Sequence, residues 1–233
     1  MPARKIRPSR YSVTGYVPSS KGTKAQDAES SLEQDFLTLL EHDQSIERYI
    51  AQPFSIRWAD DSGKRHRYTP DAIVKYCYSA LLDNPYLRTT IFEVKPTEVL
   101  KRDWDELKPR FRSAIGWAKE YGCRFHIITE KQIRTPYLTN VRFLKDYKNI
   151  PEQLELKVAR QSLVIKTLLQ LKQTTPHALL HAMTRDEQLQ AELIPWIWNL
   201  LNMQFIGADL TKPLTMVSPI WETSITKRFH CSL

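Results

Sequence analysis

YTPDAIV, residues 68–74, and TIFEVKP, residues 90–96, are the two stretches that decide the fold and the chemistry of this chain. Each is an apolar, strand-like run that carries one acidic residue, Asp71 in the first and Glu93 in the second. Lys95 follows Glu93 by two positions, and side chains on a strand alternate with a period of two, so both point to the same face. The pattern predicts two carboxylates and one ammonium on neighbouring strands.

These three groups suit the hydrolysis of a DNA strand. Hard divalent cations prefer carboxylate oxygens such as those of Asp71 and Glu93. A cation held there lowers the pKa of a bound water and shields the charge that develops on a phosphodiester, while Lys95 adds a further positive centre. We therefore expect a Mg²⁺-dependent DNA endonuclease, with Mn²⁺ as a substitute. Each fragment alone is weak evidence, because Pro-Asp also begins many turns and Glu-x-Lys is often a solvated charge pair.

A third carboxylate, Glu33, lies in SSLEQDFLTLL, residues 30–40. The apolar residues of this stretch follow the i, i+4, i+7, i+8 spacing of an amphipathic helix. Ser30 and Glu33 also form the S-x-x-E capping box that opens a helix, which is a purely structural explanation of the glutamate. The alternative is that Glu33 joins Asp71 and Glu93 at the metal.

In chain order, a helix glutamate, a strand aspartate and a strand Glu-x-Lys resemble a restriction-endonuclease-like active site. The phrases LE-x-DF, Y-x-x-QPF, YTPD and EVKP further resemble TnsA, the endonuclease subunit of heteromeric cut-and-paste transposases, over about residues 27–150. The resemblance implies an α/β fold with a mixed sheet flanked by helices. It also implies a catalytic lysine at Lys95 and metal ligands at Glu33, Asp71, Glu93 and the backbone carbonyl of Val94.

The same resemblance implies a specific task. A TnsA-type subunit cuts the 5′ ends of a transposon in double-stranded DNA, while a DDE transposase subunit cuts the 3′ ends under the control of an AAA+ ATPase regulator. Two alternatives remain open: an independent restriction, repair or junction-resolving nuclease, and a catalytically silent DNA-binding adaptor. The four intact site residues argue against the adaptor.

Positive charge concentrates at the N-terminus. The formal net charge is +8, and residues 1–26 contain no acidic residue and six basic ones. We expect residues 1–26 to be a flexible basic arm that contacts DNA phosphates; a merely solubilising tail is the alternative. The residues concerned are Arg4, Lys5, Arg7, Arg10, Lys21 and Lys24.

Residues 27–150 are expected to form the catalytic domain, with alternating strands and helices. IERYIAQPFSIRW (46–58) is expected to be a strand interrupted at Pro53, followed by a hairpin around Gly63. We expect a loop over 79–89 and a helix over 99–122 that Pro109 either kinks or delays. A short helix then leads out of the sheet.

Residues 151–233 are expected to form a second domain. Three amphipathic helices, the second beginning at Thr175 and Pro176, precede a small β-ribbon, which is the order of a winged helix. Its net charge is only +1, so we expect a role in assembly and DNA positioning. The pair His177 and His181 lacks the glutamate of a zinc hydrolase, and the sequence offers no glycine-rich ATP loop.

Composition agrees with a soluble cytoplasmic protein that associates with the bacterial nucleoid when active. Hydrophobic residues make up 42% and charged residues 26% of the chain. We expect neither a membrane span nor a secretory signal, because no apolar run approaches the ~20 residues a span requires. The three cysteines lack metal-ligand spacing and are expected to be reduced.

Overall fold

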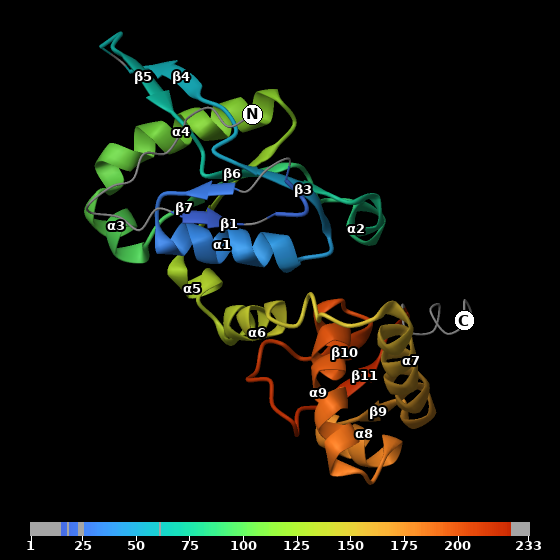
Figure 1. The fold of residues 1–233 in the computed structure, drawn as a ribbon. Helices are drawn as coiled ribbons and strands as arrows, with labels where there is room; N and C mark the ends of the chain where they lie inside the picture. The colour runs from blue at the N-terminus through green and yellow to red at the C-terminus, as the bar shows by residue number, and fades with distance from the viewer. Residues whose placement is uncertain (1–14, 18, 23–25, 61, 225–233) are drawn as a thin grey trace. The chain divides into compact units, whose positions relative to one another are not determined.

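The computed structural model describes residues 15–17, 19–22, 26–60 and 62–224. The chain folds into two compact units, residues 1–134 and residues 135–233 (Figure 1). The division differs from the expected one at residue 150, because helix α6 (Pro136–Lys145) belongs to the second unit. The side-chain amide of Asn140 on α6 bonds the backbone of residues 210, 212 and 214.

A mixed four-stranded sheet forms the centre of the first unit. Its strand order is β3 (Ile46–Ala51), β6 (Ala72–Tyr76), β7 (Thr90–Val94) and β8 (Arg124–Ile128). The first two pairings are antiparallel and β7–β8 is parallel. All five residues of β7 are buried, as expected for a central strand covered on both faces.

Helices cover both faces of this sheet. On one face, Phe36 of α1 (Ser31–His42) packs against Phe92 of β7 with ring centroids 5.1 Å apart. On the other, Ile91 packs against the small residues Ala114 and Ala118 of α4 (Trp104–Glu120) (Figure 1). Because side chains alternate along β7, Glu93 faces α4 together with Ile91.

The interruption at Pro53 separates strands that belong to different sheets. β3 ends at Ala51, and β4 (Ile56–Ala59) pairs instead with β5 (Arg65–Tyr68) in an antiparallel hairpin. Gly63 has φ +81° in the turn, a conformation that favours glycine. The expected hairpin around Gly63 is confirmed, and Figure 1 shows it extending beyond the sheet next to α4.

Two local expectations were wrong. The segment expected as a loop contains helix α2 (Tyr78–Asp83), because its Ala and Leu residues favour helix and Asn84-Pro85 marks only its end. The single helix expected over 99–122 is two helices: α3 (Thr97–Arg102) ends before Asp103, and α4 begins at Trp104, ahead of Pro109, and runs through the proline.

The smaller elements of the first unit lie at its edges. β1 (Gly15–Val17) pairs antiparallel with β2 (Gln26–Ala28), and this pair contacts α1. The segment expected to be a flexible arm therefore includes strand β1. A short helix, α5 (Glu130–Ile133), follows β8 and also contacts α1.

The second unit is built from helices around an apolar core. α7 (Leu154–Leu171), α8 (Pro176–Met183) and α9 (Glu187–Asn202) pack against one another, and α9 also packs against α6. Thr175 caps α8 by accepting a hydrogen bond from the backbone N–H of Ala178, as its sequence predicts. β10 (Ile206–Ala208), β11 (Ile220–Glu222) and β9 (Gln173–Thr174) form an antiparallel sheet in that order.

Trp196 and Trp198 of α9 are buried in this core together with Leu, Ile and Val side chains from the other helices. They are therefore packing residues, not a stacking platform for bases. Within the described ranges, no helix is both long and apolar enough to cross a membrane.

Candidate active site

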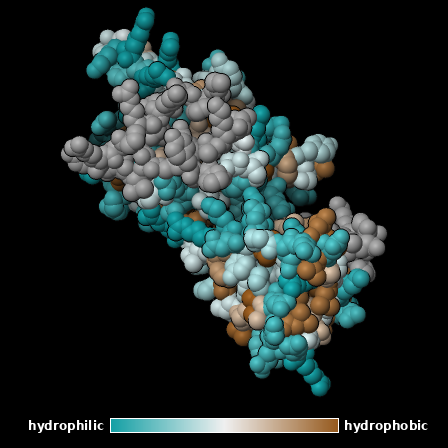
Figure 2. Space-filling view, viewed as in Figure 1, coloured by the Kyte–Doolittle hydropathy of each residue, from teal (hydrophilic) through white to brown (hydrophobic). Residues whose placement is uncertain are grey.

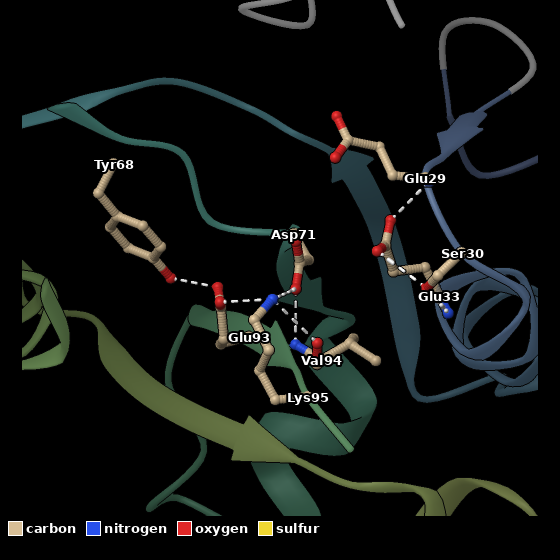
Figure 3. Close-up of polar contacts among 8 residues, drawn as sticks. All are labelled: Glu29, Ser30, Glu33, Tyr68, Asp71, Glu93, Val94 and Lys95. Carbon is tan, nitrogen blue, oxygen red and sulfur yellow. Dashed lines mark hydrogen bonds and ion pairs between the residues drawn. The ribbon is translucent and has the colours of Figure 1, made fainter. Parts of the chain in front are cut away.

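Backbone pairing brings Asp71 and Glu93 together. The N–H of Asp71 donates to the carbonyl of Phe92 (3.0 Å), immediately before β6 joins the ladder with β7. The Asp71 carboxylate accepts a hydrogen bond from the N–H of Val94 at 2.7 Å. The aspartate of one strand is thus fixed on the backbone of the strand that carries Glu93 and leads into Lys95 (Figure 3).

The Lys95 ammonium is surrounded by three oxygen atoms. Its Nζ lies 2.9 Å from Glu93 Oε1, 3.9 Å from Asp71 Oδ2 and 3.3 Å from the carbonyl oxygen of Val94. Figure 3 shows the Lys95 side chain turned back toward the two carboxylates. The sequence expectation that Glu93 and Lys95 share a face with Asp71 is therefore met by the geometry.

Tyr68 holds the other oxygen of Glu93. Its hydroxyl donates to Glu93 Oε2 at 2.5 Å, and both residues are buried. Burial and the Glu93 charge raise the pKa of Tyr68 far above its usual value, so this hydroxyl remains a donor. Tyr68 belongs to the YTPD motif, but no sequence signal indicates that its hydroxyl reaches Glu93.

Burial and neighbouring charges shift the pKa values of Asp71 and Lys95. Burial, followed by the Glu93 charge, raises the pKa of Asp71 well above its usual value, although Lys95 opposes this. Burial alone would lower the pKa of Lys95, but the Asp71 and Glu93 carboxylates outweigh it and raise that pKa. Lys95 is therefore charged at neutral pH, and its ammonium is a positive charge held beside two carboxyl groups.

Glu33 lies apart from this cluster. Its carboxylate accepts from the Ser30 hydroxyl at 3.0 Å and from the N–H of Glu29 at 2.8 Å, while Ser30 Oγ accepts from the N–H of Glu33 at 3.2 Å. Ser30 thus caps the helix as the motif predicts, but the Glu33 carboxylate accepts from the N–H of Glu29 and not from that of Ser30, so the reciprocal capping box is not complete. Burial raises the pKa of Glu33 overall. The hydrogen bonds to Glu29 and Ser30 and the charge of Lys95 oppose this rise in part. Glu33 therefore interacts electrostatically with Lys95, but its drawn hydrogen bonds go to Ser30 and Glu29 (Figure 3).

A cavity of about 480 Å³ opens over the carboxylates. Asp71, Glu93 and Lys95 line it, and so do three residues that sequence reasoning missed: Gln52, Arg67 and Arg110. Gln52 is 5% exposed and its Oε1 has no hydrogen-bond partner among the described residues. Only the QPF phrase could have drawn attention to Gln52, and no sequence signal distinguishes Arg110 from the other basic residues of α4.

The expected DNA-contacting arm is only partly described. Arg4, Lys5, Arg7, Arg10 and Lys24 lie outside the described residues, as does Cys231. The Lys21 ammonium donates to the carbonyls of Leu40 (2.9 Å) and Asp43 at the C-terminal end of α1. Such contacts satisfy carbonyls that a helix end leaves without partners. The structure therefore places Lys21 at the end of α1, and its expected phosphate contact stays a prediction.

The donor atoms at the site fit a hard divalent cation. The three oxygens around the Lys95 ammonium, from Asp71, Glu93 and Val94, are the expected metal ligands and already surround one positive charge. In the described ranges, no three His, Cys, Asp or Glu side chains gather closely enough to share an ion. The oxygens gathered here are thus those of two carboxylates and one carbonyl, and Glu33 is not among them.

Comparison with known protein families found one matching domain. Residues 43–130 match the family model described as "TnsA-like endonuclease N terminal". The matched segment contains Asp71, Glu93 and Lys95, and it excludes Glu33. A comparison with curated proteins gave no match.

Proposed function

We propose, from the premise that residues 43–130 are a TnsA-like endonuclease domain, that this chain is a Mg²⁺-dependent endonuclease that cuts the 5′ ends of a transposon. One observation carries the proposal: the Lys95 ammonium lies within hydrogen-bond distance of Glu93 and within 3.9 Å of Asp71. A half-buried lysine between two carboxylates at the ends of adjacent strands is a costly arrangement for a purely structural role. It is useful where a phosphodiester must be cut.

Asp71, Glu93 and the carbonyl of Val94 would hold the cation. When bound, Mg²⁺ supplies charge neutralisation at the phosphate and acidifies a water. Displaced from its carboxylate partners, Lys95 can donate a hydrogen bond to a phosphate oxygen or orient the attacking water. Tyr68 fixes the rotamer of Glu93, because it binds Oε2 and leaves Oε1 directed at the site.

Glu33 is assigned an outer role. Its carboxylate is already engaged by Ser30 and Glu29, so we propose that it holds a water beside the site and does not bind the cation directly. This role agrees with the electrostatic influence between Glu33, Lys95 and Asp71.

The second unit is proposed to be a winged helix that serves assembly and DNA positioning. The order α7-β9-α8-α9-β10-β11, with the three strands in one antiparallel sheet, supports this interpretation. The proposed partners are double-stranded DNA at the transposon ends, a DDE transposase subunit and an AAA+ ATPase regulator. The match to a TnsA-like domain supports this proposal.

The test reconstitutes cutting at transposon ends. The full chain is incubated with Mg²⁺, duplex ends of the element that encodes it, and the transposase and ATPase encoded beside it, and nicks are mapped on each strand. The proposal expects 5′-end cuts that require both partners and disappear with Lys95→Ala. Unrestricted cutting by the chain alone would indicate an independent nuclease, and no cutting under any condition would indicate a silent adaptor.

A further inference from the structure

The β4–β5 hairpin has two different faces. Ile56 and Tyr68 are buried on one face, where Trp58 and His66 also stack with ring centroids 4.4 Å apart. This face packs toward α4. The opposite face carries three exposed arginines and one alanine, because side chains alternate along each strand. Its residues are Arg57, Ala59, Arg65 and Arg67.

The arginines on this outer face have been placed side by side by the strand register. Arg57 pairs directly with Arg67, and Arg65 pairs with Ala59. Like charges directly opposite each other on adjacent strands are destabilising. Across the described ranges, none of the three guanidinium groups has an ion-pair or hydrogen-bond partner. The face is therefore an uncompensated positive surface that a polyanion would stabilise.

The one acidic side chain described in the hairpin turn does not neutralise this surface. Asp60 accepts from the Ser62 hydroxyl (2.6 Å), from the N–H of Lys64 (3.0 Å) and pairs with His66 Nε2 (2.7 Å). Its carboxylate is thus committed to the turn and to the inner face. Figure 2 shows that the protruding end of this unit, where the hairpin lies in Figure 1, is strongly hydrophilic.

This positive face continues into the active-site cavity. Arg67 lines the same cavity as Asp71 and Glu93, and Arg110 of α4 lines it as well. Arg110 also lacks an ion-pair partner within the described part of the chain. Guanidinium groups would therefore lie along a DNA strand from the hairpin to the carboxylates in the cavity.

Gln52 supplies an independent sign that the cavity receives a polar ligand. Its side-chain oxygen is buried and unpaired, although a buried polar atom without a partner is costly. Its backbone has φ +46°, which is strained for a residue other than glycine, and its N–H donates to the carbonyl of Asp71 at 2.9 Å. The strained backbone of Gln52 is thus hydrogen-bonded directly to Asp71.

We propose that the outer face of the β4–β5 hairpin, with Arg110 and Gln52 in the cavity, binds the DNA backbone next to the phosphodiester that is cut. This inference rests on the proposed nuclease function and names the surface that positions its substrate. The arginines contact phosphates and so fix register without reading sequence. The unpaired Gln52 oxygen accepts a hydrogen bond from a water held on the bound strand, because the oxygens of a DNA backbone can accept but not donate.

The test measures DNA binding by the full chain in the absence of divalent cations, so that no cutting occurs. Fluorescence anisotropy with a duplex is recorded over a range of KCl concentrations for the triple variant R57A/R65A/R67A. The matched control, K108A/R112A/K119A, removes the same charge from exposed residues of α4 that do not line the cavity. Each lost phosphate contact should lower the slope of log K against log salt by about 0.9.

We expect the hairpin variant to lose about 2 to 3 in slope and at least ~10-fold in affinity, and the control to lose less than about 1 in slope. A further variant, R57K/R65K/R67K, keeps the charge and should retain most of the slope; melting curves of all variants establish that they fold. Equal effects of the hairpin and control variants would overturn the proposal while leaving the nuclease function standing. No DNA binding by the unmodified chain would overturn both.

Discussion

The two units of this chain bury polar groups in opposite ways. The first unit holds half-buried ionisable groups whose pKa values are shifted, above all Asp71, whose pKa is raised beside the buried Glu93. The second buries neutral amides that are hydrogen-bonded: Gln161 donates to Asn199 at 2.9 Å, and Asn199 donates to the carbonyl of Tyr147 at 2.7 Å. The ionisable cluster of the first unit therefore lowers the stability of the fold, whereas the amide network of the second unit raises it.

The largest expected effects fall on the charged cluster. Asp71→Ala, Glu93→Ala and Lys95→Ala should each lower the cleavage rate at least ~10²-fold, the scale seen when one charge-stabilising group is deleted. The melting temperature of Asp71→Ala should hold or rise, because one of two mutually repelling carboxylates is removed. Single-turnover cleavage and thermal melts check this, with the exposed Lys101→Ala as control; near-normal cutting by Lys95→Ala would refute its catalytic role.

The neutral network of the second unit should behave in the opposite way. Asn199→Ala leaves Gln161 and a backbone carbonyl without their partners, so it should destabilise that unit by about 2 to 3 kcal/mol. Chemical denaturation measures the loss, and Asn202→Ala at the end of the same helix is the matched control. If Asn199→Ala melts like the control, the amide network does not stabilise the second unit as described.

Tyr68→Phe tests whether the hydroxyl orients Glu93. The variant keeps the ring but loses a hydrogen bond to a charged group, which is worth about 1.5–3 kcal/mol, and 1.4 kcal/mol corresponds to tenfold in rate. Cleavage should fall about 10-fold, while Tyr78→Phe, altered at a tyrosine that is 74% exposed, should not change it. An unchanged rate for Tyr68→Phe would leave Glu93 oriented by Lys95 alone.

The smallest expected effect is a pH-dependent change in stability with Asp71→Asn. The folded-state pKa of Asp71 lies above its usual value of 3.8, so its contribution to stability is fully present below that value and is lost as pH rises through the folded pKa. Asn cannot ionise and retains an oxygen for the N–H of Val94. Without divalent cations, the variant should melt higher than the unmodified chain at neutral pH, by about 2 to 4 °C per kcal/mol regained.

This advantage should shrink as the pH is lowered, because protonation removes the charge that Asp71 carries at neutral pH. Asp105→Asn, an exposed change in the same unit, serves as the control. A stability difference for Asp71→Asn that is constant between acid and neutral pH would show that burial of the charge is not its cause.

Local signals predicted the parts of the fold that depend on neighbours in sequence. The Ser30 helix cap, the Thr175-Pro176 helix start and the turn at Gly63 each occur where the pattern placed them. The alternation Glu93-x-Lys95 likewise requires only that the segment be a strand. These features are fixed within a few residues, so the sequence contains what is needed to infer them.

Features that depend on distant contacts were not predictable. Asn140 assigns α6 to the second unit through bonds to residues about 70 positions away. Arg110 and Tyr68 reach the site from a helix and a hairpin whose placement follows from packing on the sheet. Lys21 looked like part of a basic arm, yet its ammonium binds the end of α1, because charge counts do not reveal which carbonyls lie within reach.

The central claim is that Asp71 and Glu93 bind a divalent cation in place of their contact with Lys95. A crystal structure of the full chain soaked in Mn²⁺ tests it most directly, through the anomalous signal of the ion. The account predicts one ion bound to oxygens of Asp71, Glu93 and Val94, with Lys95 Nζ displaced from its 2.9 Å contact with Glu93. A Lys95 ammonium still seated between the carboxylates, with no ion within coordination reach of Asp71, would contradict it.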